Sequence, residues 1–216
     1  MPALRPLLLI LALLLAPRWA AADEETDLTA EVEQISRTVI ADSQMAAEAT
    51  VCPTQLMSGR KGSSLLPPMY CRVGNMSVCL AKCQEGTASA CYWLAQVLEY
   101  KKAPETATAP LFQRACRFGI ASGCTNRASR LLSLEASNTA QQRCAAATFV
   151  AACDANDPWA CTMNAMVLGQ GLAGRTDFDA ALKSLEKSCN NGQDDPACTY
   201  GTRLREDIEA RKAAKP

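Results

Sequence analysis

Apolar residues recur every three or four positions along most of the chain, which is the pattern of helices with one buried face. After Asp177, for example, Phe178, Ala181, Leu182 and Leu185 repeat at this spacing. The same pattern predicts further helices and no regular alternation of the kind that strands show. The predicted helices cover residues 24–49, 76–85, 88–100, 108–118, 121–135, 139–154, 159–167, 177–189 and 197–212.

The chain begins with a stretch typical of a secretory signal peptide over residues 1–22. Arg5 supplies a positive start, an apolar run follows from Leu7 to Leu15, and Ala20 to Ala22 provide a small-residue cleavage site. The alternative is a membrane anchor, but the run is shorter than the roughly 20 residues needed to span a bilayer. We therefore expect cleavage, no membrane span in the mature chain, and a periplasmic or secreted location.

Two segments precede the repeating part of the chain. Residues 23–50 predict one helix, with Leu28, Val32, Ile35 and Val39 on one face, which caps the array or leads into it. A dimerising coiled coil is the less favoured alternative, because only about two heptads are present. Residues 51–75 predict a loop, since several prolines and glycines exclude a long helix.

Twelve cysteines, an even number, indicate a disulfide framework in an exported chain. Four close pairs have members eight or nine positions apart, and each pair encloses turn-forming residues. Eight residues of continuous helix rise about 12 Å, whereas a disulfide tolerates at most roughly 7 Å between Cα atoms. A bridge within a pair therefore requires a turn that joins two helices. The expected bridges are Cys83–Cys91, Cys116–Cys124, Cys153–Cys161 and Cys189–Cys198.

The other four cysteines leave alternatives open. Cys71 has the repeat's eight-residue spacing to Cys79, but a Cys52–Cys71 bridge would tether the loop equally well. Cys79 and Cys144 have the least obvious partners. We expect one of these two to be a free thiol or to pair with another chain.

The first cysteines of the four pairs, at positions 83, 116, 153 and 189, are 33, 37 and 36 residues apart. A period in this range is typical of helical solenoids. The unit from Ala152-Cys153 through Ala160-Cys161, Gly169, Gly171, Gly174 and Asp177 to Ala197-Cys198 resembles the cysteine-rich Sel1-like repeats, relatives of the tetratricopeptide arrays. The resemblance covers about residues 76–213. It implies an all-α, right-handed α/α solenoid over residues 76–216, stapled by disulfides and closed by a C-terminal capping helix.

Composition and charge exclude several classes of function. Without Arg5 and Arg18, the 22 Lys and Arg side chains of the whole chain become 20, against 22 Asp and Glu. This near-neutral balance contains no basic stripe, so we expect no nucleic-acid partner. The chain has no histidine, which excludes Ser-His-Asp and Cys-His catalysis. It has no Cys-x-x-Cys motif either, and we expect no metal, no cofactor and no catalytic residue.

The alternative to a binding scaffold is an enzyme that acts on cell-wall or β-lactam substrates. The resemblance suggests it, because some cysteine-rich Sel1-like proteins are described as penicillin-binding or as β-lactamases. The Ser-x-x-Lys pattern of such enzymes occurs at Ser58–Lys61 and at Ser184–Lys187, and Ser188–Asn190 gives a Ser-x-Asn. No Lys-Thr-Gly follows. A third hypothesis, an assembly factor that carries copper or haem on spare cysteines, ranks last among these functions.

The hypothesis we favour is a non-catalytic scaffold that binds a protein or peptide. A solenoid has an extended concave face, which the first helix of each unit usually lines. The outward positions of these helices mix aromatic, amide and guanidinium groups, which suits protein contacts. The candidates are Tyr92, Gln96, Tyr100, Asn126, Arg130, Asn164, Tyr200 and Arg203.

Overall fold

The computed structural model describes residues 18–57, 68–72, 74–133, 139–172 and 174–214, and this part of the chain is all-α. None of its helices combines the length and apolar character that a membrane span needs. The eleven helices of these ranges are α2 (Arg18–Ala41), α3 (Ser43–Ala49), α4 (Pro53–Leu56), α5 (Met76–Gln84), α6 (Ala88–Tyr100), α7 (Glu105–Arg117), α8 (Ala121–Ser133), α9 (Thr139–Asp154), α10 (Pro158–Gln170), α11 (Phe178–Leu185) and α12 (Pro196–Ala213).

Most predicted helices lie where the apolar spacing put them, and α6 and α9 match their predicted ranges. The helix expected over 177–189 is shorter, because α11 ends at Leu185 and hydrogen bonds between residues three apart carry the chain on from there as turns. Residues 18–22 of the predicted signal peptide form the first part of α2. Its remainder lies outside the described residues.

The single helix expected over 23–50 is wrong, because the chain breaks at Asp42 into α2 and α3. Asp42 has an extended backbone, and its carboxylate accepts a hydrogen bond from the Met45 amide at 3.0 Å, which caps α3. The following loop contains one short helix, α4, which starts at Pro53 because a proline fits the first turn.

Four of five short disulfides staple the end of one helix to the start of the next, and the fifth, Cys71–Cys79, ties the segment before α5 to α5. The four pairs expected from spacing are bonded, and so is Cys71–Cys79, which the sequence left open against Cys52–Cys71. Their Cα atoms lie 4.4–4.9 Å apart. Within three of the expected pairs a glycine turns the chain with positive φ, and Asn156 does so at φ 66° in the fourth.

The sixth disulfide joins Cys52 to Cys144, which are 92 residues apart. All twelve cysteines are therefore bonded, and the expected free or intermolecular thiol at Cys79 or Cys144 is wrong. Proximity in sequence gave no sign of this pair, because Cys52 follows α3 while Cys144 lies within α9.

The stapled helices pack consecutively, from α5 on α6 to α11 on α12. We call α5, α7, α9 and α11 the second helices, because each precedes a bridged turn, and α6, α8, α10 and α12 the first helices, because each follows one. Small residues let these helices approach closely. A Cβ added to Gly123 of α8 would lie 2.8 Å from the Ala115 Cβ and 2.9 Å from backbone atoms of α7.

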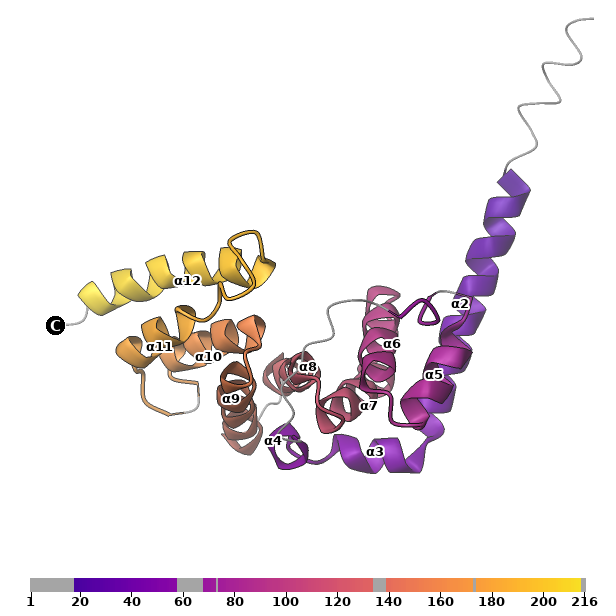
Figure 1. Cartoon of the computed structure of the whole chain (residues 1–216), viewed down its shortest axis with the longest axis horizontal. Coiled ribbons are helices and arrows are strands. Elements are labelled where there is room, and N and C mark those ends of the chain that lie inside the picture. Colours follow the sequence, from indigo (N-terminus) through magenta and orange to yellow (C-terminus); the bar gives the residue numbers. More distant parts are fainter. Residues whose placement is uncertain (1–17, 58–67, 73, 134–138, 173, 215–216) are drawn as a thin grey trace, which may run out of the picture.

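The N-terminal segment, residues 29–57, lies along the second helices. Helix α2 contacts α5 and α7, α3 contacts α7, and α4 contacts α7, α8 and α9. In Figure 1 this segment follows one edge of the molecule from α5 past α7 to α9. The segment thus covers successive helix pairs instead of only leading into the first of them.

Polar contacts fasten the N-terminal segment to the helix pairs. The Glu31 carboxylate accepts hydrogen bonds from the amides of Gly74 and Met76 at 2.7 and 2.8 Å, at the start of α5. Glu48 lies between Arg114, at 3.2 Å, and Arg117. The Glu48 and Arg114 side chains are only 10% and 6% exposed, so their charges depend on each other for compensation.

Glu48→Gln should lower the free energy of unfolding by about 3 kcal/mol, because it leaves the buried Arg114 guanidinium without a counter-charge. Chemical denaturation of the oxidised protein measures this. The matched control is Glu33→Gln, which removes one partner of the exposed Glu33–Arg37 pair and should cost less than about 0.5 kcal/mol. Equal effects of the two substitutions would show that Glu48 does not fasten the N-terminal segment.

Candidate functional site

All eight predicted surface residues lie on the first helices. Tyr92, Gln96 and Tyr100 belong to α6, Asn126 and Arg130 to α8, Asn164 to α10, and Tyr200 and Arg203 to α12. The structure brings some of them together and holds others in internal contacts.

One group joins α6 to α8 through Tyr92. The Tyr92 hydroxyl accepts a hydrogen bond from the Gln96 amide at 3.3 Å and is also bonded to the Asn126 side chain. The Tyr92 ring meets the Phe112 ring edge-on at 6.0 Å. Burial, followed by the nearby Asp157 carboxylate, raises the pKa of Tyr92, so its hydroxyl stays protonated as a hydrogen-bond donor.

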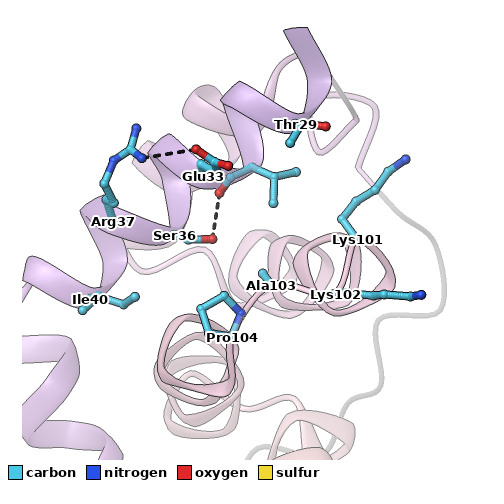
Figure 2. A pocket seen from close by; sticks show the side chains of 10 residues that line it. Thr29, Glu33, Ser36, Arg37, Ile40, Lys101, Lys102, Ala103 and Pro104 are labelled. Carbon is cyan, nitrogen blue, oxygen red and sulfur yellow. Dashed lines mark hydrogen bonds and ion pairs between the residues drawn. The ribbon is translucent and has the colours of Figure 1, made fainter. Parts of the chain in front are cut away.

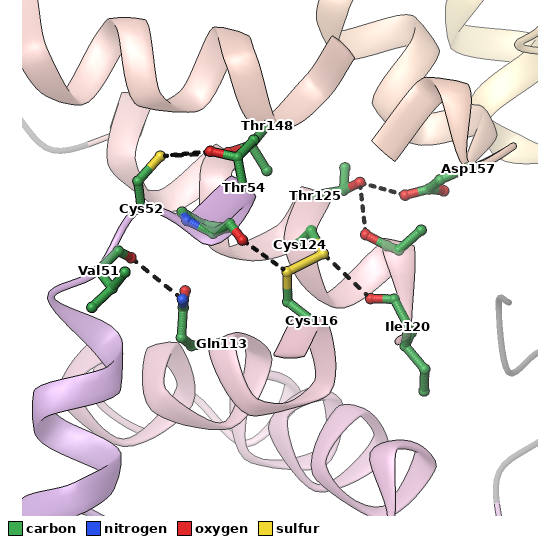
Figure 3. The surroundings of a disulfide bond; sticks show 12 residues. Val51, Cys52, Thr54, Gln113, Cys116, Ile120, Cys124, Thr125, Thr148 and Asp157 are labelled. Carbon is green, nitrogen blue, oxygen red and sulfur yellow. Dashed lines mark hydrogen bonds between the residues drawn. A yellow bond between two sulfur atoms is a disulfide. The ribbon is translucent and has the colours of Figure 1, made fainter. Parts of the chain in front are cut away.

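Asp157 is a buried carboxyl at the junction of this group with the next helix pair. It lies in the turn before α10 and is bonded to the hydroxyls of Thr125 and Ser122 on α8. Figure 3 shows Thr125 and Asp157 facing each other beside the Cys116–Cys124 bridge. Burial raises the pKa of Asp157 to about 6, although its hydrogen bonds act in the opposite direction.

The Thr125 hydroxyl explains why a protonated Asp157 fits this site. The Thr125 oxygen lies within hydrogen-bond range of both Asp157 and the Ala121 carbonyl, but the hydroxyl has one proton to donate. When Asp157 is protonated, it donates to Thr125 and Thr125 donates to Ala121. Asp157 is not among the predicted site residues, because its only signal in the sequence is that of an Asn-Asp-Pro turn.

An aromatic pair joins α10 to α12. The rings of Trp159 and Tyr200 lie 6.0 Å apart, and these residues remain 41% and 45% exposed. Arg203 is exposed one turn further along α12. Tyr200 and Arg203 were predicted surface residues, whereas Trp159 was counted only as an apolar residue of its helix.

Asn164 is not an open surface residue, and its predicted outward position is wrong. It is 8% exposed, and its amide donates to the Ser184 hydroxyl of α11 at 2.7 Å. Arg130 forms a close ion pair with Glu99, which joins α8 to α6. Tyr100 is 81% exposed, at the end of α6 with the Lys101 ammonium 5.6 Å from its ring.

The Ser-x-x-Lys residues have other contacts. Ser58 and Lys61 lie outside the described residues. Ser184 receives the Asn164 hydrogen bond, and the Lys187 ammonium pairs with Asp154 at 3.2 Å. Ser188 is fully buried, and the Thr162 hydroxyl lies 2.9 Å from its oxygen. In the described part of the chain, no group of three or more His, Cys, Asp or Glu side chains is placed to hold a metal ion.

A groove of about 490 Å³ lies between α2 and the loop that joins α6 to α7. Figure 2 shows Ser36 and Ile40 on the α2 side facing Lys101 to Pro104 of the loop. The Glu33–Arg37 ion pair, at 3.5 Å, lies along its α2 wall. None of the eight predicted residues lines this groove, so it is separate from the predicted surface.

No protein-family model, curated protein or solved structure matches the chain. The assignment of a function therefore rests on the residues and on the geometry described above.

The buried Asp157 should make stability depend on pH. In the unfolded chain this carboxyl ionises near pH 4, whereas in the folded protein it does so near pH 6. Between these values the folded state binds more protons, so the Asp157 contribution to stability is present below pH 4 and is lost as the pH rises through 6.

Asp157→Asn removes this dependence. From pH 4 to pH 7, the unfolding free energy of the variant minus that of wild type should increase by roughly 2–3 kcal/mol, because the pKa shift is about two units. Urea denaturation at each pH measures the difference. Asp154→Asn, which alters an exposed carboxylate on the same turn, is the control and should show no such gain. A pH-independent difference for Asp157→Asn would contradict the role of its burial.

Proposed function

We propose that the chain is a non-catalytic scaffold of Sel1-like helix pairs that binds a protein or peptide in the periplasm or outside the cell. Six disulfides support an oxidising location, since such bonds persist outside the reducing cytosol. The steps of 33, 37 and 36 residues between first cysteines support the Sel1-like repeat.

The arrangement of a right-handed superhelix is part of this proposal. In such an array the first helices of successive units lie next to one another and line one face. The contacts of α10 with both α8 and α12, and the bond between Tyr92 of α6 and Asn126 of α8, are consistent with that order.

The observation that carries the proposal is the Trp159–Tyr200 pair. Two large aromatic residues from different helix pairs lie side by side and keep almost half of their surface exposed. Tryptophan and tyrosine are enriched among the residues that dominate binding at protein interfaces. With Arg203 beside them, they offer flat apolar contact area next to hydrogen-bond donors.

We infer that the partner inserts an apolar or aromatic side chain against this pair. The Tyr92–Gln96–Asn126 group on the preceding first helices supplies hydroxyl and amide groups for backbone contacts. Because a disulfide holds each first helix to the second helix before it, the surface needs little ordering on binding, which favours affinity.

Selection of a displayed random-peptide library on the oxidised protein tests the proposal. Enriched peptides should bind wild type and should bind the Trp159→Ala/Tyr200→Ala double variant at least tenfold more weakly, because the variant lacks the aromatic contact area. Met69→Ala/Val78→Ala, which truncates two exposed apolar residues elsewhere, is the matched control and should stay within twofold. Enriched peptides that bind the aromatic double variant as well as wild type would contradict the proposed site.

A further inference from the structure

The second helices form a series of grooves, and the chain fills the first two of them itself. Between α5 and α7, the apolar face of α2 packs with Val32, Ile35 and Val39 against Leu80 and Leu111. Between α7 and α9 lies the strap, which we define as residues 48–57 at the end of the N-terminal segment. The third groove, between α9 and α11, contains no described part of the chain.

The strap meets α7 through the ion pairs of Glu48 with Arg114 and Arg117, and it meets both α7 and α8 through backbone carbonyls. The Arg127 guanidinium of α8 donates to the Ala49 carbonyl at 2.9 Å. The Gln113 amide of α7 donates to the Val51 carbonyl at 3.3 Å.

Further along the strap, the Pro53 carbonyl oxygen lies 3.7 Å from the Cys116 sulfur. On the α9 side, Cys52 is bonded to Cys144 and lies 3.9 Å from the Thr148 hydroxyl. Figure 3 shows Cys52 and Thr148 together, and Val51 with Gln113 on the neighbouring side of the groove.

The cysteine register identifies the equivalent positions of the third groove. Cys116 to Cys153 is a step of 37 residues, as is Cys124 to Cys161, and Cys153 to Cys189 is a step of 36. Applied to five residues that touch the strap backbone or Cys52, these steps give Val150 for Gln113, Cys153 for Cys116, Asn164 for Arg127, Ala180 for Cys144 and Ser184 for Thr148. They also give Ala151 for Arg114 and Asp154 for Arg117, so the third groove lacks the two cations that pair with Glu48 in the strap's groove.

All five equivalent residues line one groove of about 240 Å³ on the surface of α9, α10 and α11. The two grooves differ in what covers them. Gln113 is fully buried, whereas Val150 at the same register position is 47% exposed. The third groove is therefore the uncovered equivalent of the site that the strap occupies.

We propose that the groove between α9 and α11 binds an extended peptide segment of a partner protein that carries an acidic side chain. The Asn164 amide uses one hydrogen on Ser184, which leaves the other for a peptide carbonyl, as Arg127 does for Ala49. The acidic preference comes from Lys183 and Lys187 on α11. By the same step of 36 residues, these lysines occupy the positions that Ala147 and Ala151 hold on α9. Lys187 pairs with Asp154, whereas the described residues show no ion pair for Lys183.

The covalent bond of the strap favours a partner over the chain's own segment. The Cys52–Cys144 disulfide keeps the strap on α9, so the same residues do not reach the third groove while the bond is intact. A second copy's strap is held by its own bond in the same way. Because Ala180 stands where Cys144 stands in the filled groove, the occupant binds there without a covalent link.

This site lies on α9, α10 and α11 and does not rest on the aromatic pair of Trp159 and Tyr200. Peptides that copy strap residues 49–57, which contain no charged residue, test it directly, with Cys52 replaced by Glu in one peptide and by Lys in the other. Fluorescence anisotropy with the oxidised full chain at low salt should show saturable binding of the Glu peptide. The Lys peptide should bind at least tenfold more weakly.

Two protein variants make the result specific. Val150→Arg, which fills the mouth of the groove, should weaken binding of the Glu peptide at least tenfold. Val78→Arg, at a valine of similar exposure on α5, should leave it within twofold. Lys183→Glu should reverse the preference between the two peptides, a result that misfolding would not produce.

Three results would overturn the proposal. One is the absence of saturable binding of either peptide up to about 1 mM. Another is binding that Val150→Arg leaves unchanged. The third is a dimer in sedimentation that Val150→Arg dissociates, which would make a second copy the occupant of the groove.

Discussion

The disulfide between the end of one helix and the start of the next is the constraint on which the rest of the structure depends. The helices are rich in alanine and make contacts such as that of Gly123 with Ala115, which bury little apolar area per residue. Closing a loop of nine or ten residues contributes roughly 2–3 kcal/mol by restricting the unfolded chain. Four such bridges hold consecutive helices at fixed spacing. That spacing places Tyr92 beside Asn126, Trp159 beside Tyr200, and one groove after another along the second helices.

The features that the sequence predicted well are local. The bridged turns follow from cysteines eight or nine positions apart with glycine, asparagine or proline between them, and the helices follow from apolar spacing over one or two turns. The break at Asp42 was missed because the apolar pattern continues across it, and only the side-chain cap onto Met45 reveals it. Of the candidate surface, the aromatic and amide positions of α6 and α12 were predictable from helical direction. Asn164 was not, because α11 covers its face of α10.

The features that the sequence could not predict are long-range. Nothing near Cys52 points to a partner 92 residues away, and the burial that raises the pKa of Asp157 depends on α8 packing over the following turn. Once the strap is seen in its groove, however, the sequence becomes informative again. The cysteine register then translates each strap contact into a position one unit further on, and Val150, Asn164 and Ser184 are found together. A tertiary contact observed in one unit thus predicts which residues of the next unit line a groove, although those residues form no recognisable sequence pattern.

The central claim is that the N-terminal segment is fixed along the second helices by Cys52–Cys144. Non-reducing digestion of the oxidised protein, followed by tandem mass spectrometry of the linked peptides, tests it most directly. The structure predicts a fragment that joins Cys52 to Cys144 and another that joins Cys71 to Cys79. A fragment that joins Cys52 to Cys71, with Cys79 and Cys144 reduced, would contradict it. That result would remove the strap from the groove of α9 and, with it, the reason to regard the next groove as its uncovered equivalent.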